Sequence, residues 1–252
     1  MIYQWGDVKI TEIANNSYLA ISCDSIGAIG DKEMDKVNVP SEWIGRVLAR
    51  VSLMELLALR VEPFLLVNTL SVEMNPTGEK INAGIRTELE TVGLDPEQSL
   101  TGSHESNITT SETGAGITAL GKCSELPKTG LGYPGLNCYL LGTPKVGGEV
   151  DLKDNDLVNL AIVKELGQIT EVLEMIPVGS QGIKYETEVL AQRSSLTPKF
   201  LPDVDSEFLN KSGGPSTCLV FTADDTGYKK AKEIANRHNT MLRKLAEFDY
   251  LK

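Results

Sequence analysis

The stretch YLAISCDSIGAIGDK, residues 18–32, sets the class of this fold. Residues 18–22 form a short apolar run, which predicts a buried strand. The run ends at Asp24, and a segment rich in Gly and Asp follows from Ser25 to Pro40. A carboxylate at the end of a buried strand, followed by glycines, is typical of a site for a metal ion or a phosphate group. Taken alone, such a pattern is more often an ordinary turn.

Downstream of this stretch, helical and strand patterns alternate. We expect a long helix from Ser41, its N-cap, to about Val61, where Glu62-Pro63 stops it. Apolar periodicity and turn residues then predict a strand over 64–72, a helix over 79–92, a polar loop over 101–113 and a strand over 114–123.

The second half of the chain follows a Gly- and Pro-containing segment, residues 128–135, which is the best candidate for a linker. The elements expected beyond it are strands over 138–141 and 217–222 and helices over 157–166, 183–192 and 228–248. The mixture predicts an α+β chain with two domains, residues 1–124 and 125–252.

The composition excludes several classes of function. The formal net charge of −11 is unsuited to binding a nucleic-acid backbone, and no apolar run approaches the length of a membrane span. The four cysteines are scattered, so we expect buried, reduced thiols rather than a zinc site. No signal peptide is visible at the start, and we expect a cytoplasmic protein. The P-loop, nucleophile-elbow and zincin motifs are all missing from the sequence.

Several polar residues stand in apolar or unusually polar surroundings. Glu55 interrupts an apolar helix, and Asn68 lies inside a predicted strand. An ionised Glu there must be paired, bound to a metal or placed on a narrow exposed stripe. Residues 102–107, GSHESN, are the most polar cluster and contain His104 and Glu105. These two side chains are able to bind a metal, phosphate or hydroxyl group, and a solvated loop explains them as well.

Taken in order, these features resemble the AIR synthetase-like (PurM-like) superfamily, which includes thiamine-monophosphate kinase. The resemblance covers roughly residues 5–122. It rests on the strand ending in Asp24, the glycine segment, the long helix before Pro63, the next strand, and a turn matching Gly-Gly-[His/Asp/Glu]-Thr. These pieces are residues 20–24, 25–30, 44–63, 64–71 and 102–105, and Trp5-Gly6-Asp7 resembles the Gly-Asp-Asp motif of thiamine-monophosphate kinase.

The resemblance implies a two-domain PurM-like fold, an ATP site with Mg²⁺, and a homodimer that pairs its N-terminal sheets. It implies metal ligands at Asp7, Asp24 and Glu55, where Glu55 replaces the Asp of relatives. The residues expected to face the nucleotide and its phosphates are Gly27, Gly30, Lys32, Asn68, Gly102 and Ser103. Asn68 and Ser103 depart from the family pattern. Asp24, His104 and Glu105 are the expected catalytic residues.

In the second half, relatives carry a His-Asp-containing glycine motif before a helix, and the matching residues here are 176–183. The acidic residue is missing, which leaves Gly179, Ser180 and Gly182 as candidates to bind the substrate. This segment resembles the branch described as α-ribazole kinase, in cobalamin salvage. The resemblance therefore implies a kinase that phosphorylates the ribose 5′-hydroxyl of α-ribazole. The alternatives are a thiamine-monophosphate kinase-like or other ATP-using enzyme of the superfamily, and a non-catalytic nucleotide-binding partner protein.

Overall fold

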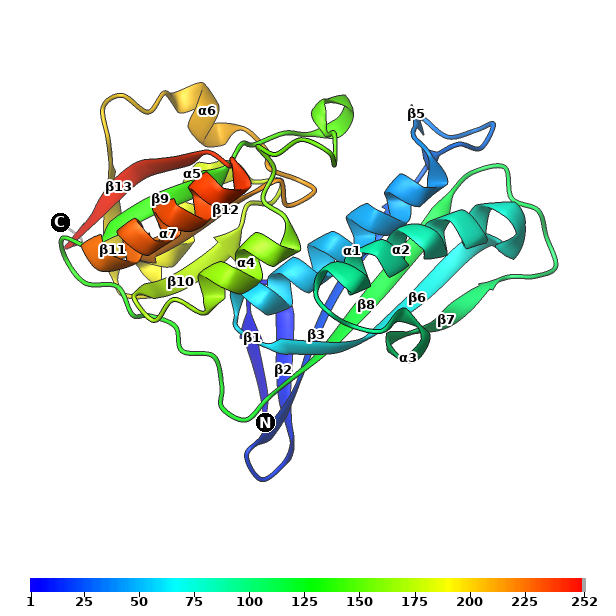
Figure 1. Ribbon diagram of the computed structural model, residues 1–252, viewed down its shortest axis with the longest axis horizontal. Coiled ribbons are helices and arrows are strands. Elements are labelled where there is room, and N and C mark those ends of the chain that lie inside the picture. The colour runs from blue at the N-terminus through cyan, green and yellow to red at the C-terminus, as the bar shows by residue number, and fades with distance from the viewer. Residues whose placement is uncertain (251–252) are drawn as a thin grey trace. The chain divides into compact units, whose positions relative to one another are not determined.

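The computed structural model describes residues 1–250, which form two compact units. Unit 1 consists of Met1–Leu57 and Val61–Leu126. Unit 2 consists of Ala58–Arg60 and the chain from Pro127 onward. Each unit has one large sheet and its own helices (Figure 1). This mixture of helices and sheets confirms the α+β class expected from the sequence.

Unit 1 is built on a six-stranded sheet. Its strands are β1 (Ile2–Trp5), β2 (Val8–Ala14), β3 (Ser17–Gly27), β6 (Glu62–Glu73), β7 (Leu100–Glu105) and β8 (Gly114–Cys123). They lie in the order β1-β2-β3-β8-β6-β7, and all neighbours are antiparallel except β6 and β7, which are parallel. A separate parallel pair, β4 (Ile29–Gly30) and β5 (Val37–Asn38), lies in the glycine-rich segment.

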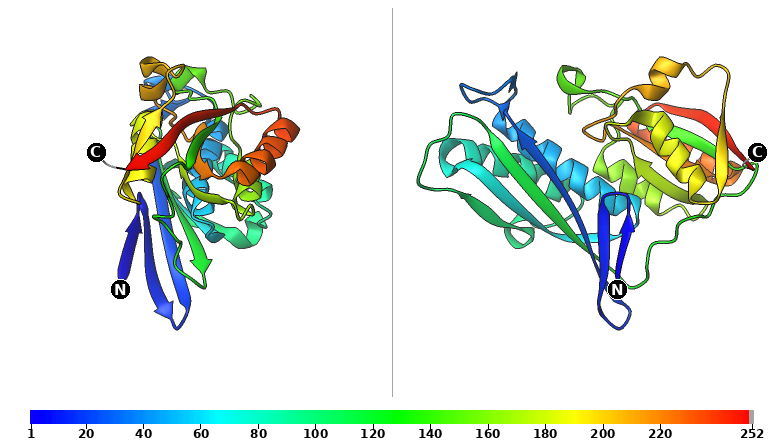
Figure 2. Two further views of the ribbon diagram at one scale, coloured as in Figure 1. Left: turned by 90° about the vertical axis from the view of Figure 1, so that its left-hand side faces the viewer. Right: turned by 180° about the vertical axis from the view of Figure 1, so that it is seen from behind.

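The sheet of unit 1 has one buried face and one open face. Along β8, Ala115, Ile117 and Ala119 are buried, while the residues between them are partly exposed. This alternation is the period-2 pattern of a sheet that packs on one side only. The helices of unit 1 lie on the buried face of the sheet. In the view from behind, the sheet lies in front of these helices and its open face is turned to the viewer (Figure 2).

Glycines allow the two main helices of unit 1 to cross closely. The helices of this unit are α1 (Ser41–Ala58), α2 (Glu79–Thr91) and the short α3 (Pro96–Ser99), and the turn η1 (Met74–Gly78) precedes α2. A Cβ atom on Gly45 would lie 1.8 Å from the Ile81 carbonyl oxygen. One on Gly84 would lie 2.0 Å from the Glu42 carbonyl oxygen. The backbones are therefore in contact at this crossing, and no larger residue fits there.

Unit 2 is built on a five-stranded antiparallel sheet. Its strands are β9 (Asn137–Gly142), β10 (Val172–Pro177), β11 (Leu196–Phe200), β12 (Cys218–Ala223) and β13 (Leu242–Tyr250). They lie in the order β10-β12-β9-β13-β11. The helices are α4 (Leu160–Gly167), α5 (Gly182–Gln192), α6 (Ser206–Asn210) and α7 (Asp225–His238), with a short 3-10 turn η2 (Gly147–Glu149).

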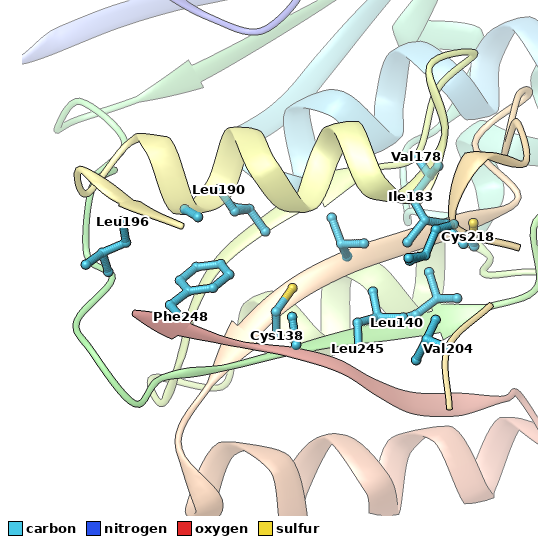
Figure 3. Packing of buried hydrophobic residues seen from close by; sticks show 14 residues of the cluster. Cys138, Leu140, Val178, Ile183, Leu190, Leu196, Val204, Cys218, Leu245 and Phe248 are labelled. Carbon is cyan, nitrogen blue, oxygen red and sulfur yellow. The ribbon is translucent and has the colours of Figure 1, made fainter. Parts of the chain in front are cut away.

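Both faces of the unit 2 sheet are buried. Helix α5 packs on one face over a cluster that includes Cys138, Leu190 and Phe248 (Figure 3). On the other face, the Tyr139 ring stacks on Phe221 and on Tyr228 of α7, with centroid distances of 5.4 and 4.8 Å. Every residue of β12 is buried, as expected for a strand covered on both sides.

Several predicted elements differ from the structure. The helix expected over 228–248 ends at His238, because Asn239 adopts the left-handed conformation with φ 53° and closes it. The residues that follow form strand β13 instead. The polar loop expected over 101–113 begins with strand β7, whose parallel pairing with β6 outweighs its low strand propensity. The long helix α1 ends at Ala58, three residues before Val61.

The expectation of four buried thiols is wrong for two of them. Cys138 and Cys218 are buried in unit 2, but Cys23 is exposed and Cys123 is half-buried. Both lie on strands of unit 1 that are covered on one side only. Among residues 1–250, none of the helices has the length and apolar content that a bilayer span requires.

Candidate functional site

Strand register brings three of the predicted site residues into one row. Asp24 on β3 pairs with Ile117 on β8, which pairs with Asn68 on β6, which in turn pairs with Gly102 on β7. Residues that pair directly across strands point to the same face of a sheet. Ile117 and Asn68 are buried, so this row lies on the helix-covered face of the sheet. Asp24 and Gly102 are the two ends of this row, so the fold aligns residues that are 78 positions apart in the sequence.

Asp24 and Asp7 form an acidic pair at one end of this row. Asp24 is half-buried near the end of β3, and Asp7 lies in the turn between β1 and β2. Burial raises the pKa of Asp24; a hydrogen bond from the Ser25 backbone opposes this rise, and the charge of Asp7 adds to it. Two carboxylates close enough to repel one another would both be stabilised by a bound cation.

A buried hydroxyl lies on the same strand face as Asp24. Ser22 is 1% exposed, and its Oγ atom has no hydrogen-bond partner among residues 1–250. It is two residues from Asp24, so both side chains point to the helix-covered face. A buried polar atom without a partner is unfavourable, and an added ligand or water at this end of the row would relieve it.

Glu55 lies in the last turn of α1. Ser41 begins this helix, and its hydroxyl donates to Asp31 at 2.7 Å. At 1.5 Å per residue, Glu55 lies about 20 Å further along the helix axis. Within residues 1–250, no group of three or more His, Cys, Asp or Glu side chains is arranged to hold a metal ion. Asp7, Asp24 and Glu55 are therefore not assembled as a three-carboxylate set.

Asn68 and Gly102 fit tightly against each other in the middle of the sheet. The Asn68 side-chain amide donates to Asn82 Oδ1 of α2 at 2.5 Å. A Cβ atom on Gly102 would lie 1.9 Å from Asn68 Oδ1 and 2.3 Å from the Asn68 carbonyl oxygen. Gly102 is therefore required because the Asn68 amide occupies the space above it. Asn and Gly are both unusual in strands, and here the glycine at 102 leaves the space that the Asn68 side chain occupies.

Residues 103–105 lie at the far end of the row. Gly102 is three strands from Asp24, and at the usual strand spacing this separates their backbones by about 14 Å. Mg²⁺ binds its ligands at about 2 Å, so one ion cannot bind Asp24 and His104 of the same chain. An extended ligand is needed to reach both ends.

The side chains of this turn have local partners. The Glu105 carboxylate accepts hydrogen bonds from the backbone N–H groups of Asn107 at 2.6 Å and Ile108 at 3.3 Å. These bonds, the one from Asn107 above all, lower the pKa of Glu105. His104 Nε2 lies 3.2 Å from the Ser106 hydroxyl. Glu105 therefore shapes the loop, and an exposed His104 is the freer of the two expected catalytic side chains.

A hollow of about 330 Å³ lies beside this turn. Hydroxyl groups, one imidazole and one carboxylate are its polar side-chain groups, and they come from the neighbouring strands β6 and β7 and from the loop before β8. The lining residues are Thr69, Leu70, Ser71, Ser103, His104, Glu105 and Thr110.

Lys32 has a role that differs from the expected phosphate contact. Its ammonium group donates to both carboxylate oxygens of Glu73, at 2.7 and 2.8 Å, and to the Thr110 carbonyl oxygen at 2.9 Å. An ammonium group has three donors, and all three are used here. The side chain is only 9% exposed. Lys32 is thus part of the internal structure and has no donor left for a phosphate.

The two glycines of the same segment differ. A Cβ atom on Gly30 would lie 2.2 Å from Thr113 Oγ1 and 2.4 Å from Asp35 Oδ2, so this glycine makes room for the Asp35–Thr113 hydrogen bonds. Gly27 is exposed at the end of β3 with nothing near its Cβ position. Of the pair, Gly27 is the one whose backbone is open to a ligand.

In unit 2, Gly179, Ser180 and Gly182 form the turn before α5. Gly182 has φ +85°, and a Cβ atom there would lie 2.8 Å from the Asn210 carbonyl oxygen, so glycine is required. The Gly179 carbonyl oxygen accepts from the N–H groups of Gly182 and Gly213 at 3.3 and 3.1 Å. The side chain of Gln181, the N-cap residue, makes no capping hydrogen bond to this helix. The segment has a structural role, and its helix start offers free N–H groups.

Sequence reasoning missed the residues that hold the glycine-rich segment in place. The Asp35 carboxylate accepts hydrogen bonds from the Lys32 backbone N–H and the Thr113 hydroxyl. The Glu73 carboxylate accepts from the Lys32 ammonium group and, at 2.6 Å, from the Thr77 hydroxyl. The available signal was Glu73 itself, a lone acidic residue at the end of an apolar strand. Burial would raise the pKa of Glu73, but the hydrogen bonds from Lys32 and Thr77 overcome this and lower it to about 2.

Comparisons with known proteins detect the fold through structure and not through sequence. No family model matches the chain, and no curated protein matches it in sequence. A solved thiamine-monophosphate kinase from Stenotrophomonas maltophilia is 15% identical, with a TM-score of 0.64, and the match covers 100% of this chain and 89% of that one. The hydrogenase maturation protein HypE in complex with ATP is 12% identical, with a TM-score of 0.66, covering 92% and 77%.

A third similar structure is PurL from T. maritima complexed with ATP. It is 15% identical with a TM-score of 0.66, and the match covers 96% of this chain but only 42% of the PurL chain. The chain has the AIR synthetase-like fold. At these identities the similarity establishes the AIR synthetase-like fold alone, so the chemistry has to be argued from the site.

Proposed function

We propose that this chain is an ATP- and Mg²⁺-dependent kinase for a small molecule. The observation that carries the proposal is the Asp7–Asp24 pair at the end of β3, in a fold shared with structures that contain ATP. The resemblance of residues 5–122 to the same superfamily supports it from the sequence.

The residues present fit a magnesium ion. Mg²⁺ takes one or two carboxylates and completes its shell with water and substrate phosphates, which matches a pair rather than a cage of three. The unpaired Ser22 hydroxyl on the same face is a further polar group at this end of the row. When bound, Mg²⁺ neutralises the charge of the triphosphate during phosphoryl transfer. Asp7 and Asp24 would hold it.

The rest of the chain contributes by positioning. Phosphoryl transfer needs little covalent chemistry from the protein, so orientation of the nucleotide supplies most of the rate. The open backbone at Gly27 suits the approach of a phosphate oxygen, while Asn68 contacts Gly102 on β7 and bonds to Asn82 on α2 in the middle of the sheet. His104, exposed beside the hollow, is the side chain available to orient nucleotide or acceptor.

We propose α-ribazole as the acceptor, phosphorylated on its ribose 5′-hydroxyl. The turn at Gly179–Gly182 carries no charged side chain of its own, and the acidic group beside it is the Glu186 carboxylate, whose Oε1 atom lies 3.7 Å from the Cβ position of Gly179. A turn without a cation and with a carboxylate beside it favours a neutral nucleoside over the anionic thiamine monophosphate. We expect purified protein with Mg²⁺ and ATP to convert α-ribazole to its 5′-phosphate, with ADP formed in equal amount. Mass spectrometry of the products, with thiamine monophosphate in a parallel reaction, measures both. Thiamine diphosphate formed while α-ribazole stays unchanged would contradict the choice of acceptor.

A non-catalytic nucleotide-binding partner is the alternative of a different class. Tight ATP binding by calorimetry, without ADP formation for any acceptor in a panel of nucleosides and vitamin precursors, would favour that alternative and reject the kinase.

We also propose that the chain forms a homodimer through the open face of the unit 1 sheet. Ile21, Leu120 and Leu65 are direct neighbours across three strands of that face and are only half-buried. An apolar row of this kind fits an interface with a second copy. We expect sedimentation to give a mass near twice 27.4 kDa at micromolar concentration. Ile21→Glu should shift the species towards the mass of one chain, whereas a wild-type protein that sediments as one chain would disprove the dimer.

A further inference from the structure

Two segments of unit 1 that are distant in sequence are fastened to each other. Residues 28–38 and 106–113 share the backbone hydrogen bonds Ala28 N–H to Thr113 O at 2.8 Å and Met34 N–H to Ser111 O at 3.0 Å. The Asp35 carboxylate accepts from both the backbone N–H and the hydroxyl of Thr113, at 2.8 and 2.7 Å. These contacts tie the two segments together near residue 113.

Lys32 of the first segment connects Thr110 of the second segment to the sheet. Its ammonium group joins the Thr110 carbonyl oxygen to the Glu73 carboxylate at the end of β6. Thr77, which is buried, donates its hydroxyl to the same carboxylate at 2.6 Å. Charge-assisted hydrogen bonds of this length are among the stronger ones in proteins, so the pair holds Thr110 firmly.

Thr110 is also part of the hydroxyl-lined hollow beside β7. Its Oγ1 atom is shielded from solvent and has no hydrogen-bond partner among residues 1–250. Thr110 is therefore fixed by Lys32 through its carbonyl oxygen and is also a lining residue of the hollow. Thr110 is the residue of the 106–113 segment that lines the hollow, and no other side-chain donor within the described part of the chain contacts its carbonyl.

We propose that Lys32 and Glu73 are a positioning pair that keeps the 106–113 segment in place, and with it Thr110 as a preformed part of the wall of the hollow. Neither residue touches the ligand. Because the pair orders the wall before a ligand binds, the free-energy cost of ordering is not charged against binding. Loss of the ion pair therefore weakens ligand binding more than it slows the chemical step. The assignment of this ligand as part of the ATP substrate rests on the proposed function, whereas the ordering of the wall does not.

The first test uses the free protein and requires no substrate. Hydrogen exchange of the amides in residues 106–113 should become about tenfold faster or more in Lys32→Met and in Glu73→Gln, because a hydrogen-bonded ion pair is lost. Thr77→Val is a milder variant that keeps the ion pair and should give a smaller increase. Lys122→Met, a matched change at an exposed lysine of β8, is the control and should leave the segment unchanged. Unchanged exchange in Lys32→Met and Glu73→Gln would overturn the proposal.

The second test measures the nucleotide. Glu73→Gln should raise the KM for ATP by about tenfold while kcat stays within about threefold, since the wall loses order but the reacting groups remain. The charge-swapped double variant Lys32→Glu/Glu73→Lys should recover part of the loss. A direct phosphate contact by Lys32 instead predicts a large fall in kcat for Lys32→Met and little effect of Glu73→Gln, which would reject the positioning role. If the wild-type protein has no ATP turnover, the proposed function fails, and hydrogen exchange alone still decides whether the pair orders the wall.

Discussion

Asp24→Asn is expected to lower ATP turnover by at least about 100-fold, equivalent to about 2.7 kcal/mol of activation free energy. The reason is that a neutral amide replaces one of the two carboxylates placed to hold Mg²⁺. The fold should persist, because Asp24 is only half-buried and relief from the charge of Asp7 offsets the change. Steady-state kinetics at saturating ATP and a Mg²⁺ titration measure the effect, and circular dichroism monitors the fold.

Asp156→Asn is a matched control, the same chemical change at an exposed aspartate of unit 2, and should leave turnover unchanged. The pH dependence provides a second check. Burial, together with Asp7, raises the pKa of Asp24, so its carboxylate becomes protonated at a higher pH than an ordinary aspartate. Wild-type turnover at limiting Mg²⁺ should therefore fall early on acidification. Wild-type rates in Asp24→Asn at limiting Mg²⁺ would show that the site is assigned wrongly.

Gly45→Ala is expected to reduce the stability of unit 1 by about 3 kcal/mol or more, a shift in Tm of about 10 °C. The added methyl group would lie 1.8 Å from the Ile81 carbonyl oxygen, and backbone atoms in a helix cannot move aside as a flexible side chain can. The two helices must therefore separate, which opens the core between them. Thermal unfolding followed by circular dichroism measures the change.

Gly27→Ala is the control for this prediction, because it adds the same methyl group in the same unit where nothing lies within 4 Å. Its Tm should stay within about 2 °C of the wild type. A Gly45→Ala protein as stable as Gly27→Ala would mean that the α1–α2 crossing is looser than described.

The local pattern of the sequence predicted five of the seven α-helices and five of the thirteen strands among residues 1–250, and two of the missed strands have a common physical cause. β8 was predicted over its full range because its alternation is regular and it ends at turn residues. β7 and β13 were missed because neither has the composition of an isolated strand. Each is held by a neighbour that is distant in sequence, β6 for β7 and β9 with β11 for β13. Such pairing is not encoded in a local window.

In the candidate site too, local features could be predicted from the sequence, whereas contacts between residues distant in sequence could not. The position of Asp24 at a strand end followed from the apolar run before it, and its row with Asn68 and Gly102 follows the predicted strands. The role of Lys32 could not be predicted, because its partner Glu73 is 41 residues away and the sequence does not show which carboxylate a lysine reaches. Glu55 was singled out by its place in an apolar helix and by the resemblance, but within residues 1–250 it forms no set of three ligating side chains with Asp7 and Asp24.

The division of the chain into two units gives them separate optical signals. Both tryptophans of the sequence, Trp5 in β1 and Trp43 in α1, belong to unit 1. The stacked rings of Tyr139, Phe221 and Tyr228 belong to unit 2. Fluorescence excited selectively at tryptophan therefore reports the denaturation of unit 1, while near-ultraviolet circular dichroism from the stacked tyrosines contains the signal of unit 2. Denaturant curves recorded with both probes coincide only if the whole chain unfolds in one cooperative step, so the protein carries its own test of two-state behaviour.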